Sequence, residues 1–281
     1  MAMKIYFLTS EIIPFAETGT LAHFSKHVPI RIQEHGCDIR LTAPKYGFIS
    51  ERKYILREVI RLREIECEFD NGIIMASAKS AFIPKTRVQV YFMEHPVWFQ
   101  PLNPLLYKSR NGRPFSDNDD RYGFFGKTAL NMLTHLFWSP DIILCNNWQS
   151  AFVPILYKSL YMNDKFYKDI KTVLLIHSLE NYAKVSKATY EKLGVTIPDH
   201  LNQEGDTVNS LVVASEFADL IITIDDSNST MSKELAQYPD FKKSYSNIKN
   251  KLETVNISED SVSGYHDVAD KIYELLQDTF V

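Results

Sequence analysis

The sequence predicts an α/β fold built on a doubly wound, mostly parallel sheet, and three observations support this prediction. Short apolar runs, of the kind that form strands buried on both faces, recur along the chain. Segments with helical periodicity lie between these runs. Strands that alternate with helices are typical of a parallel sheet with helices on both faces. The expected strands span residues 4–9, 38–43, 88–93, 141–145, 173–177 and 220–224.

Four helices are expected between these strands. Residues 21–34 form the first, and Gly36 follows it, as glycine commonly does after the last turn of a helix. Residues 119–137 carry apolar side chains at helical spacing. Two more helices are expected over residues 148–161 and 208–217.

Residues 54–94 break the alternation and predict an antiparallel insertion or edge addition. Three probable strands, 54–62, 73–81 and 88–93, contain few helix signals and are separated by turn sequences such as FDNG and IPKT. Residues 100–118 are rich in proline, asparagine, serine and glycine, which predicts a surface loop.

The end of the chain predicts a tail with one amphipathic helix. Residues 226–264 are polar, whereas residues 265–280 place apolar side chains on one helical stripe. That stripe needs a partner surface, and the body of the domain is the nearest one. We therefore expect a Rossmann-like domain over residues 1–230 and a C-terminal helical tail over residues 231–281 that packs back on it. The stripe consists of Val268, Ile272, Leu275, Leu276 and Phe280.

Composition argues against several classes of protein. The 281 residues carry a formal net charge of -4, so no basic field favours nucleic acid. The cysteines, Cys37, Cys67 and Cys145, are far apart, which indicates neither a disulfide framework nor zinc and suits a reducing, cytoplasmic setting. No apolar stretch has the length of a membrane span, no signal peptide is evident, and no metal, NAD or ATP motif is present.

Four anchors, in order along the chain, carry a family resemblance. The anchors are SEIIPFAETGTLAHF (10–24), APKYGFISERKYILREVIRL (43–62) with RVQVYFMEHPVWF (87–99), SPDIILCNNWQSAFVPILYK (139–158) and VLLIHSLENYA (173–183). Together they resemble the N-terminal domain of bacterial glycogen and starch synthases, which are ADP-glucose-using glucosyltransferases of family 5 with the GT-B fold. The resemblance covers the chain from about residue 3 to about residue 230.

The resemblance implies a fold, a reaction and a division of labour. In that family the glucan acceptor lies mainly against the N-terminal half, and a second Rossmann-like domain holds most of the nucleotide sugar. Glucose passes from ADP-glucose to a 4-hydroxyl of an α-1,4-glucan, with no metal and no further cofactor. Because 281 residues are too few for both domains, we expect the single N-terminal half of a GT-B fold. We hypothesise that the final helix corresponds to the family helix that crosses back onto this half.

The ETGT loop departs from the family pattern at two of its four residues. Glu17 stands where the family has a lysine that contacts the donor phosphate, and a carboxylate there would repel a diphosphate. Thr18 and Gly19 are kept, and Gly19 permits close approach or positive φ. Thr20 replaces a second glycine, although backbone N–H groups at the helix start could still bind an anion. The alternative is an ordinary strand-to-helix turn, capped by Thr18 or Thr20.

Further candidate site residues follow the fourth and fifth parallel strands. Asn147 replaces a family aspartate that hydrogen-bonds glucose, and Gln149 replaces a histidine or other polar residue. Trp148 matches the family tryptophan, as a core residue or as an apolar face for a sugar. His177 matches a family histidine beside the transferred glucose and is the candidate catalytic residue; alternatively, backbone groups satisfy it at a strand end. Ser178 replaces a family asparagine.

Two classes of function remain open from the sequence. The chain could be an incomplete glucosyltransferase that borrows a donor-binding domain, or a non-catalytic glucan-binding or regulatory relative. The changed site residues and the expected missing domain favour a protein that is inactive alone. An α-glucan is the implied ligand. An open cleft face also predicts self-association or a protein partner, whereas nucleic acid and membranes are not expected.

Overall fold

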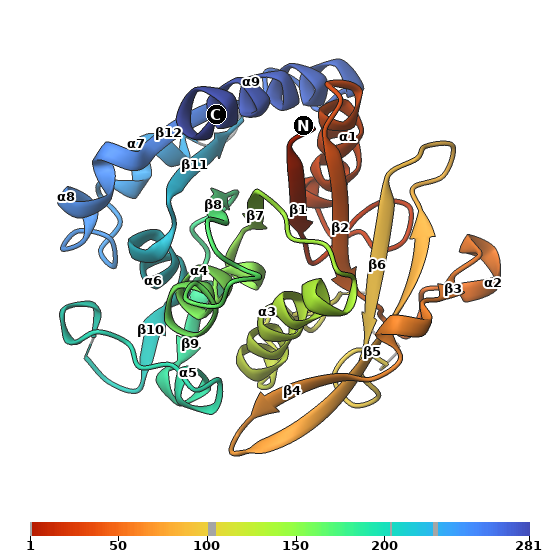
Figure 1. Cartoon of the computed structure of the whole chain (residues 1–281). Coiled ribbons are helices and arrows are strands. Elements are labelled where there is room, and N and C mark those ends of the chain that lie inside the picture. Colours follow the sequence, from red (N-terminus) through yellow and green to blue (C-terminus); the bar gives the residue numbers. More distant parts are fainter. Residues whose placement is uncertain (1, 101–104, 203, 227–229) are drawn as a thin grey trace.

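The computed structural model describes residues 2–100, 105–202, 204–226 and 230–281 (Figure 1). Seven strands run parallel in the order β12-β11-β8-β7-β1-β2-β6. All six strands predicted for this sheet are present, and the α/β, Rossmann-like class is confirmed. The parallel strands are β1 (Lys4–Leu8), β2 (Asp38–Pro44), β6 (Gln89–Glu94), β7 (Ile142–Asn146), β8 (Lys171–Ile176), β11 (Leu220–Asp225) and β12 (Leu252–Asn256).

Helices cover both faces of the sheet (Figure 1). On β1, Tyr6 and Phe7 point to opposite faces because side chains alternate along a strand. The Tyr6 hydroxyl donates to the Ala129 carbonyl of α3 at 3.2 Å, whereas the Phe7 ring lies 6.3 Å from the Phe24 ring of α1. Helices α4 and α6 pack in the layer of α3, and α9 packs on α1. These helices are α1 (Thr20–Glu34), α3 (Asn118–His135), α4 (Val153–Leu156), α6 (Ser210–Phe217) and α9 (Val262–Phe280).

Three of the four expected helices, α1, α3 and α6, lie within two residues of their predicted boundaries. Gly36 follows α1 with φ +88, as predicted. The expected helix over residues 148–161 is instead a 3₁₀ turn, η2 (Trp148–Ser150), then α4, then a π-helical turn, η3 (Tyr157–Tyr161). Pro154 lacks a backbone N–H, so a new helix start at Val153 places it in the first turn, where no donor is needed.

The insertion is antiparallel, as predicted, but the prediction that residues 54–62 form its first strand is wrong. Residues 54–62 form the end of α2 (Glu51–Tyr54), the two-residue β3 (Arg57–Glu58) and the turn η1 (Ile60–Leu62). The pairing strand is β4 (Ile65–Phe69), which forms a hairpin with β5 (Gly72–Phe82). Strand β6 pairs antiparallel with β5 and parallel with β2, so it joins the insertion to the main sheet. The expected surface loop at 100–118 lies partly outside the described residues, at 101–104.

The tail contains a strand that the sequence analysis did not predict. Strand β12 lies at the edge of the main sheet, and its LETVN sequence has a single fully buried side chain, Val255. The amphipathic stripe of α9 is confirmed, since Val268, Ile272 and Leu276 are buried. The remaining short elements are α5 (Lys187–Lys192), α7 (Met231–Leu235), α8 (Tyr245–Ile248), β9 (Lys184–Ser186), β10 (Thr207–Asn209), η4 (Asn181–Ala183), η5 (Asp199–Leu201) and η6 (Lys249–Lys251).

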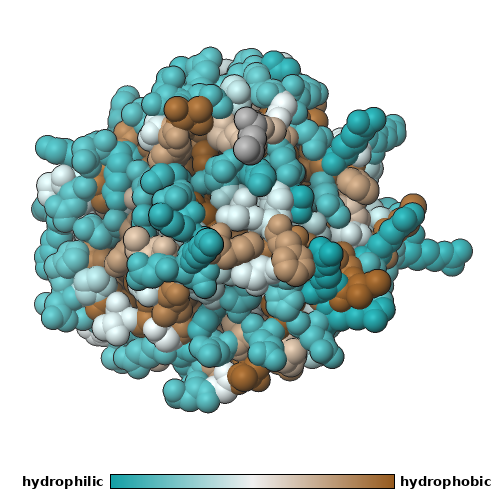
Figure 2. All heavy atoms as spheres, in the orientation of Figure 1, coloured by the Kyte–Doolittle hydropathy of each residue, from teal (hydrophilic) through white to brown (hydrophobic). Residues whose placement is uncertain are grey.

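The surface of the described chain is mostly hydrophilic on the face seen in Figure 2, where apolar residues form small separate areas. Within the described ranges, no helix combines the length and the apolar character needed to cross a membrane.

Candidate functional site

The carboxyl ends of three neighbouring strands bring the predicted site residues together. Strands β8, β7 and β1 are adjacent in the sheet, so the residues that follow them meet at one edge. The amide nitrogen of Asn146, at the end of β7, donates to the Leu8 carbonyl of β1 at 2.8 Å. His177 follows β8 and contacts Asn146 from the other side.

His177 is held by a side chain rather than by the backbone. Its Nε2 lies 3.1 Å from Asn146 Oδ1. Because the amide nitrogen of Asn146 is already committed to Leu8, Oδ1 accepts, and the proton of the neutral ring is on Nε2. The imidazole also meets the Phe24 ring edge-on at 4.6 Å. Although part of the side chain reaches the surface, desolvation lowers the pKa of His177 to about 3, so the ring is neutral at pH 7.

Asn147 occupies a strained turn directly after β7. Its φ of 58° lies in the left-handed region, and its N–H donates to the Leu175 carbonyl at 2.8 Å. The amide nitrogen donates to Ser178 Oγ at 3.0 Å. Among the described residues, Asn147 Oδ1 has no hydrogen-bond partner although it is buried. This unpartnered acceptor would suit a ligand hydroxyl.

Trp148 and Gln149 are both deeply buried. Trp148 is 1% exposed, and the rings of Tyr122 and Tyr107 meet it edge-on at 5.0 and 5.6 Å. The packing favours the core alternative, since an indole this buried has no free face for a sugar. Gln149 is 2% exposed, and its Oε1 lacks a partner in the described part of the chain.

The ETGT loop is not capped as expected. Helix α1 begins after Gly19, with no side-chain cap, and the Thr18 hydroxyl instead donates to Glu11 Oε2 at 2.8 Å. Thr20 is the first helical residue. Gly19 has an extended φ of -175°, and a Cβ there would meet nothing within 4 Å, so positive φ is not what requires this glycine. Glu17 is 59% exposed and pairs with His23 at 3.0 Å.

Glu11 is the residue that the sequence analysis missed. It is 3% exposed, three residues beyond β1, and the Thr18 backbone N–H also donates to its Oε2. Desolvation raises the pKa of Glu11 to about 7, opposed by the two hydrogen bonds from Thr18 and reinforced by the charge of Glu17. The sequence feature that could have identified Glu11 is an acidic residue within three positions of the end of a buried strand, at the edge where α/β ligands bind.

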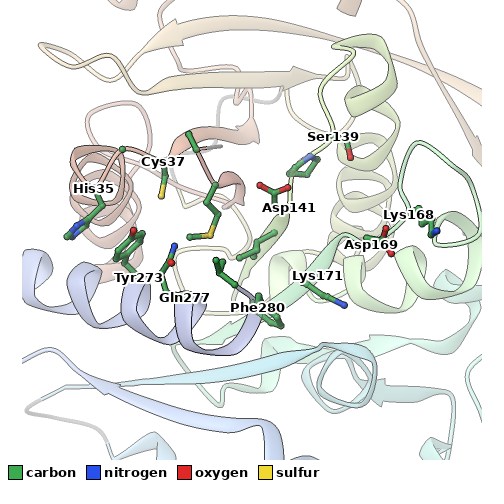
Figure 3. Close-up of a pocket in the computed structure, with 16 residues that line it drawn as sticks. His35, Cys37, Ser139, Asp141, Lys168, Asp169, Lys171, Tyr273, Gln277 and Phe280 are labelled. Atoms are coloured by element: carbon green, nitrogen blue, oxygen red, sulfur yellow. The ribbon is translucent and has the colours of Figure 1, made fainter.

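A pocket of about 710 Å³ lies at the opposite edge of the sheet. It borders the starts of β1, β7 and β8, with Tyr273, Gln277 and Phe280 of α9 pointing into it (Figure 3). It is therefore separate from the candidate site. In the described ranges, no three His, Cys, Asp or Glu side chains are placed to hold a metal ion.

Comparisons with known proteins agree with this architecture. Residues 4–247 match the family model described as the starch synthase catalytic domain. The chain is 33% identical over 221 residues to a glycogen synthase of Pelodictyon phaeoclathratiforme, and 30% identical over 238 residues to one of Chlorobaculum parvum. These alignments cover 78% and 84% of this chain but only 45% and 48% of the relatives, so the chain spans about half their length.

A solved structure shares the fold. The catalytic domain of starch synthase IV from Arabidopsis thaliana, bound to ADP and acarbose, superposes with a TM-score of 0.75 at 21% identity. The match covers 91% of this chain and 52% of that one, which is the extent expected for one half of a GT-B fold. The strand order, the matched residues and the two sets of relatives agree, and the chain belongs to the family of starch synthase catalytic domains.

Proposed function

We propose that this chain binds an α-glucan at the carboxyl edge of β1, β7 and β8 and does not by itself transfer glucose from ADP-glucose. In the family, glucosyl transfer from ADP-glucose to an α-1,4-glucan is the implied reaction. The observation that carries the proposal is the pair of carboxylates, Glu11 and Glu17, at the loop where a donor diphosphate would approach.

The loop is poorly suited to a diphosphate for two reasons. The Thr18 N–H, one of the backbone donors near the start of α1, is already taken by Glu11. Glu17 adds an exposed negative charge where the family pattern has a lysine. Two like unit charges 4 Å apart repel by about 1 kcal/mol in bulk water and about 4 kcal/mol near a protein surface. Removing the lysine and adding a carboxylate therefore both weaken donor binding.

The same edge is better suited to a neutral polyhydroxyl ligand. At this edge Asn147, which is 6% exposed, has an Oδ1 atom without a partner among the described residues. An unpaired buried acceptor costs free energy, and a sugar hydroxyl that reached it would donate to it and satisfy it. His177 would offer the acceptor nitrogen Nδ1 of a neutral ring, since Nε2 carries the proton.

Isothermal titration calorimetry with a maltooligosaccharide and with ADP-glucose tests the proposal. We expect binding heat with the maltooligosaccharide, none with ADP-glucose, and no glucose transfer when both are present. Asn147→Leu should weaken glucan binding at least several-fold because it removes the amide and its Oδ1 acceptor. Robust transfer by this chain alone would overturn the proposal, and binding of neither ligand would favour a scaffold role.

A charge-reversal variant separates the loop argument from general electrostatics. Glu17→Lys combined with Thr20→Gly is expected to raise the affinity for ADP relative to the original chain. Glu64→Lys changes the net charge by the same amount as Glu17→Lys, at an exposed position on the insertion, and should leave ADP affinity unchanged. Equal gains from both would mean that the loop has no specific part in excluding the diphosphate.

We also propose that the face around this edge takes a second copy or a protein partner. The family resemblance supports this, because in two-domain relatives the corresponding face borders the interdomain cleft. Size-exclusion chromatography with light scattering should then show a species larger than one chain; a strict monomer at all concentrations would count against self-association.

A further inference from the structure

A stripe of basic residues on α1 faces the C-terminal helix. His23, His27 and Arg31 recur every four residues, so they lie along one side of α1, and His35, the residue that follows the helix, continues the row. Helix α9 packs along that side (Figure 1). The stripe begins next to the ETGT loop, through the 3.0 Å contact between His23 and Glu17.

The second half of the stripe forms a clasp with Asp270 of α9. Arg31 donates to both carboxylate oxygens, at 2.7 and 3.0 Å, and His35 Nε2 lies 2.6 Å from Oδ1. The His35 ring also stacks on Tyr273 at 4.4 Å, with the planes only 4° apart. The hydrogen bonds from Arg31 lower the pKa of Asp270, so this carboxylate stays charged in mild acid and the clasp should not weaken there.

The first half of the stripe, His23 and His27, contacts α9 through stacked rings rather than through an ion pair with an α9 carboxylate. The rings of His27 and His23 stack on Tyr265 of α9 at 5.6 and 6.5 Å, and the Tyr265 hydroxyl donates to Asp260 at 2.7 Å. Burial under α9 lowers the pKa of His27, and the nearby charges of Lys26, His23 and His266 lower it further.

Carboxylates also face this half of the seam. Asp260 partly offsets the lowering of the His27 pKa, Asp226 faces Tyr265, and Glu17 pairs with His23. The balance at His27 still favours the neutral ring.

We propose that α9 is a strap whose N-terminal half loosens from α1 on acidification below about pH 6.5, while its C-terminal half stays clasped at Asp270. The direction of this pH dependence follows from the lowered pKa of His27. A base held neutral in the docked state contributes its full stabilisation above the pKa of the free side chain and loses it as the pH falls below that value. Loosening would remove Tyr265 from His23, which contacts the ETGT loop, but the proposal does not depend on the proposed glucan function.

Hydrogen exchange of the full chain at pH 7.5 and 5.5, corrected for intrinsic rates, tests this strap. Protection of the first turns of α9, from Val262 to Ala269, should fall several-fold at pH 5.5, whereas protection from Lys271 to Phe280 should stay within twofold. His27→Phe keeps a flat ring on Tyr265 but cannot ionise, so it should retain protection at pH 5.5.

His200→Phe is the matched control, because it removes a 57% exposed imidazole that lies beside Glu216, away from α9. This variant should behave like the original chain. If His27→Phe fails to fold, His27→Gln gives the same test, because glutamine cannot ionise either. Equal protection at both pH values, uniform loosening of all of α9, or unchanged acid sensitivity in the folded His27→Phe or His27→Gln variant would overturn the proposal.

Discussion

Replacing Trp148 by alanine is expected to lower the free energy of unfolding by about 3–5 kcal/mol. The indole is 1% exposed, and it is enclosed by Tyr122, from α3, and Tyr107, from a loop. Truncation removes its buried apolar area and leaves a cavity that these rings can fill only partly. Urea denaturation, followed by circular dichroism, measures the change. Trp148→Phe should lose much less, because it retains most of the volume.

A second tryptophan supplies the control for this prediction. Trp98 is only half-buried, against His95 and Phe124, so Trp98→Ala should cost less than Trp148→Ala. If Trp148→Ala instead kept full stability but lost maltooligosaccharide binding, Trp148 would be a sugar-binding face, and the core assignment would be wrong.

The second large effect is a gain of stability in alkaline solution when Glu11 becomes glutamine. The pKa of Glu11 is raised from 4.5 to about 7, so the folded state holds its proton to higher pH than the unfolded state does. Stability therefore falls as the pH rises from 4.5 through 7, and the full cost is present above pH 7. Since the pKa differs by about 2.5 units, this cost is up to roughly 3 kcal/mol.

Glu11→Gln removes that cost while keeping an acceptor for Thr18. The variant should match the original chain near pH 4.5 and exceed it in unfolding free energy at pH 8. Urea denaturation at several pH values measures both curves. Glu17→Gln is the matched control, because Glu17 is 59% exposed, and no comparable pH-dependent gain is expected. Parallel curves for Glu11→Gln and the original chain would show that the carboxylate of Glu11 pays no burial cost.

Local patterns predicted the central sheet well and the periphery less well. The six predicted strands are buried on both faces, so their composition alone marks them. Residues 54–62 are also rich in strand-forming side chains, yet α2 ends at Tyr54 and Ile55 has a left-handed φ of 55°, which interrupts an extended strand at its start. Strand β12 was missed because an edge strand with one buried residue lacks an apolar run.

The candidate site was likewise predictable in part. Its location was predictable, because side chains after adjacent parallel strands meet at one edge, and Asn147 and His177 do so. The surroundings of each side chain were not predictable. The hydrogen bonding of Glu11 comes from Thr18, seven residues later, and the enclosure of Trp148 needs the Tyr107 ring from a loop about forty residues earlier.

The fold class, the family and the edge of the sheet that carries the candidate site were all predictable from the amino-acid sequence. Apolar runs and motif spacing are local properties that survive without coordinates. Three features needed the three-dimensional structure: Glu11 lies beneath the ETGT loop, Trp148 is enclosed, and the histidines of α1 face α9. Burial and charge state depend on which distant groups exclude water, and separation along the chain does not reveal those contacts.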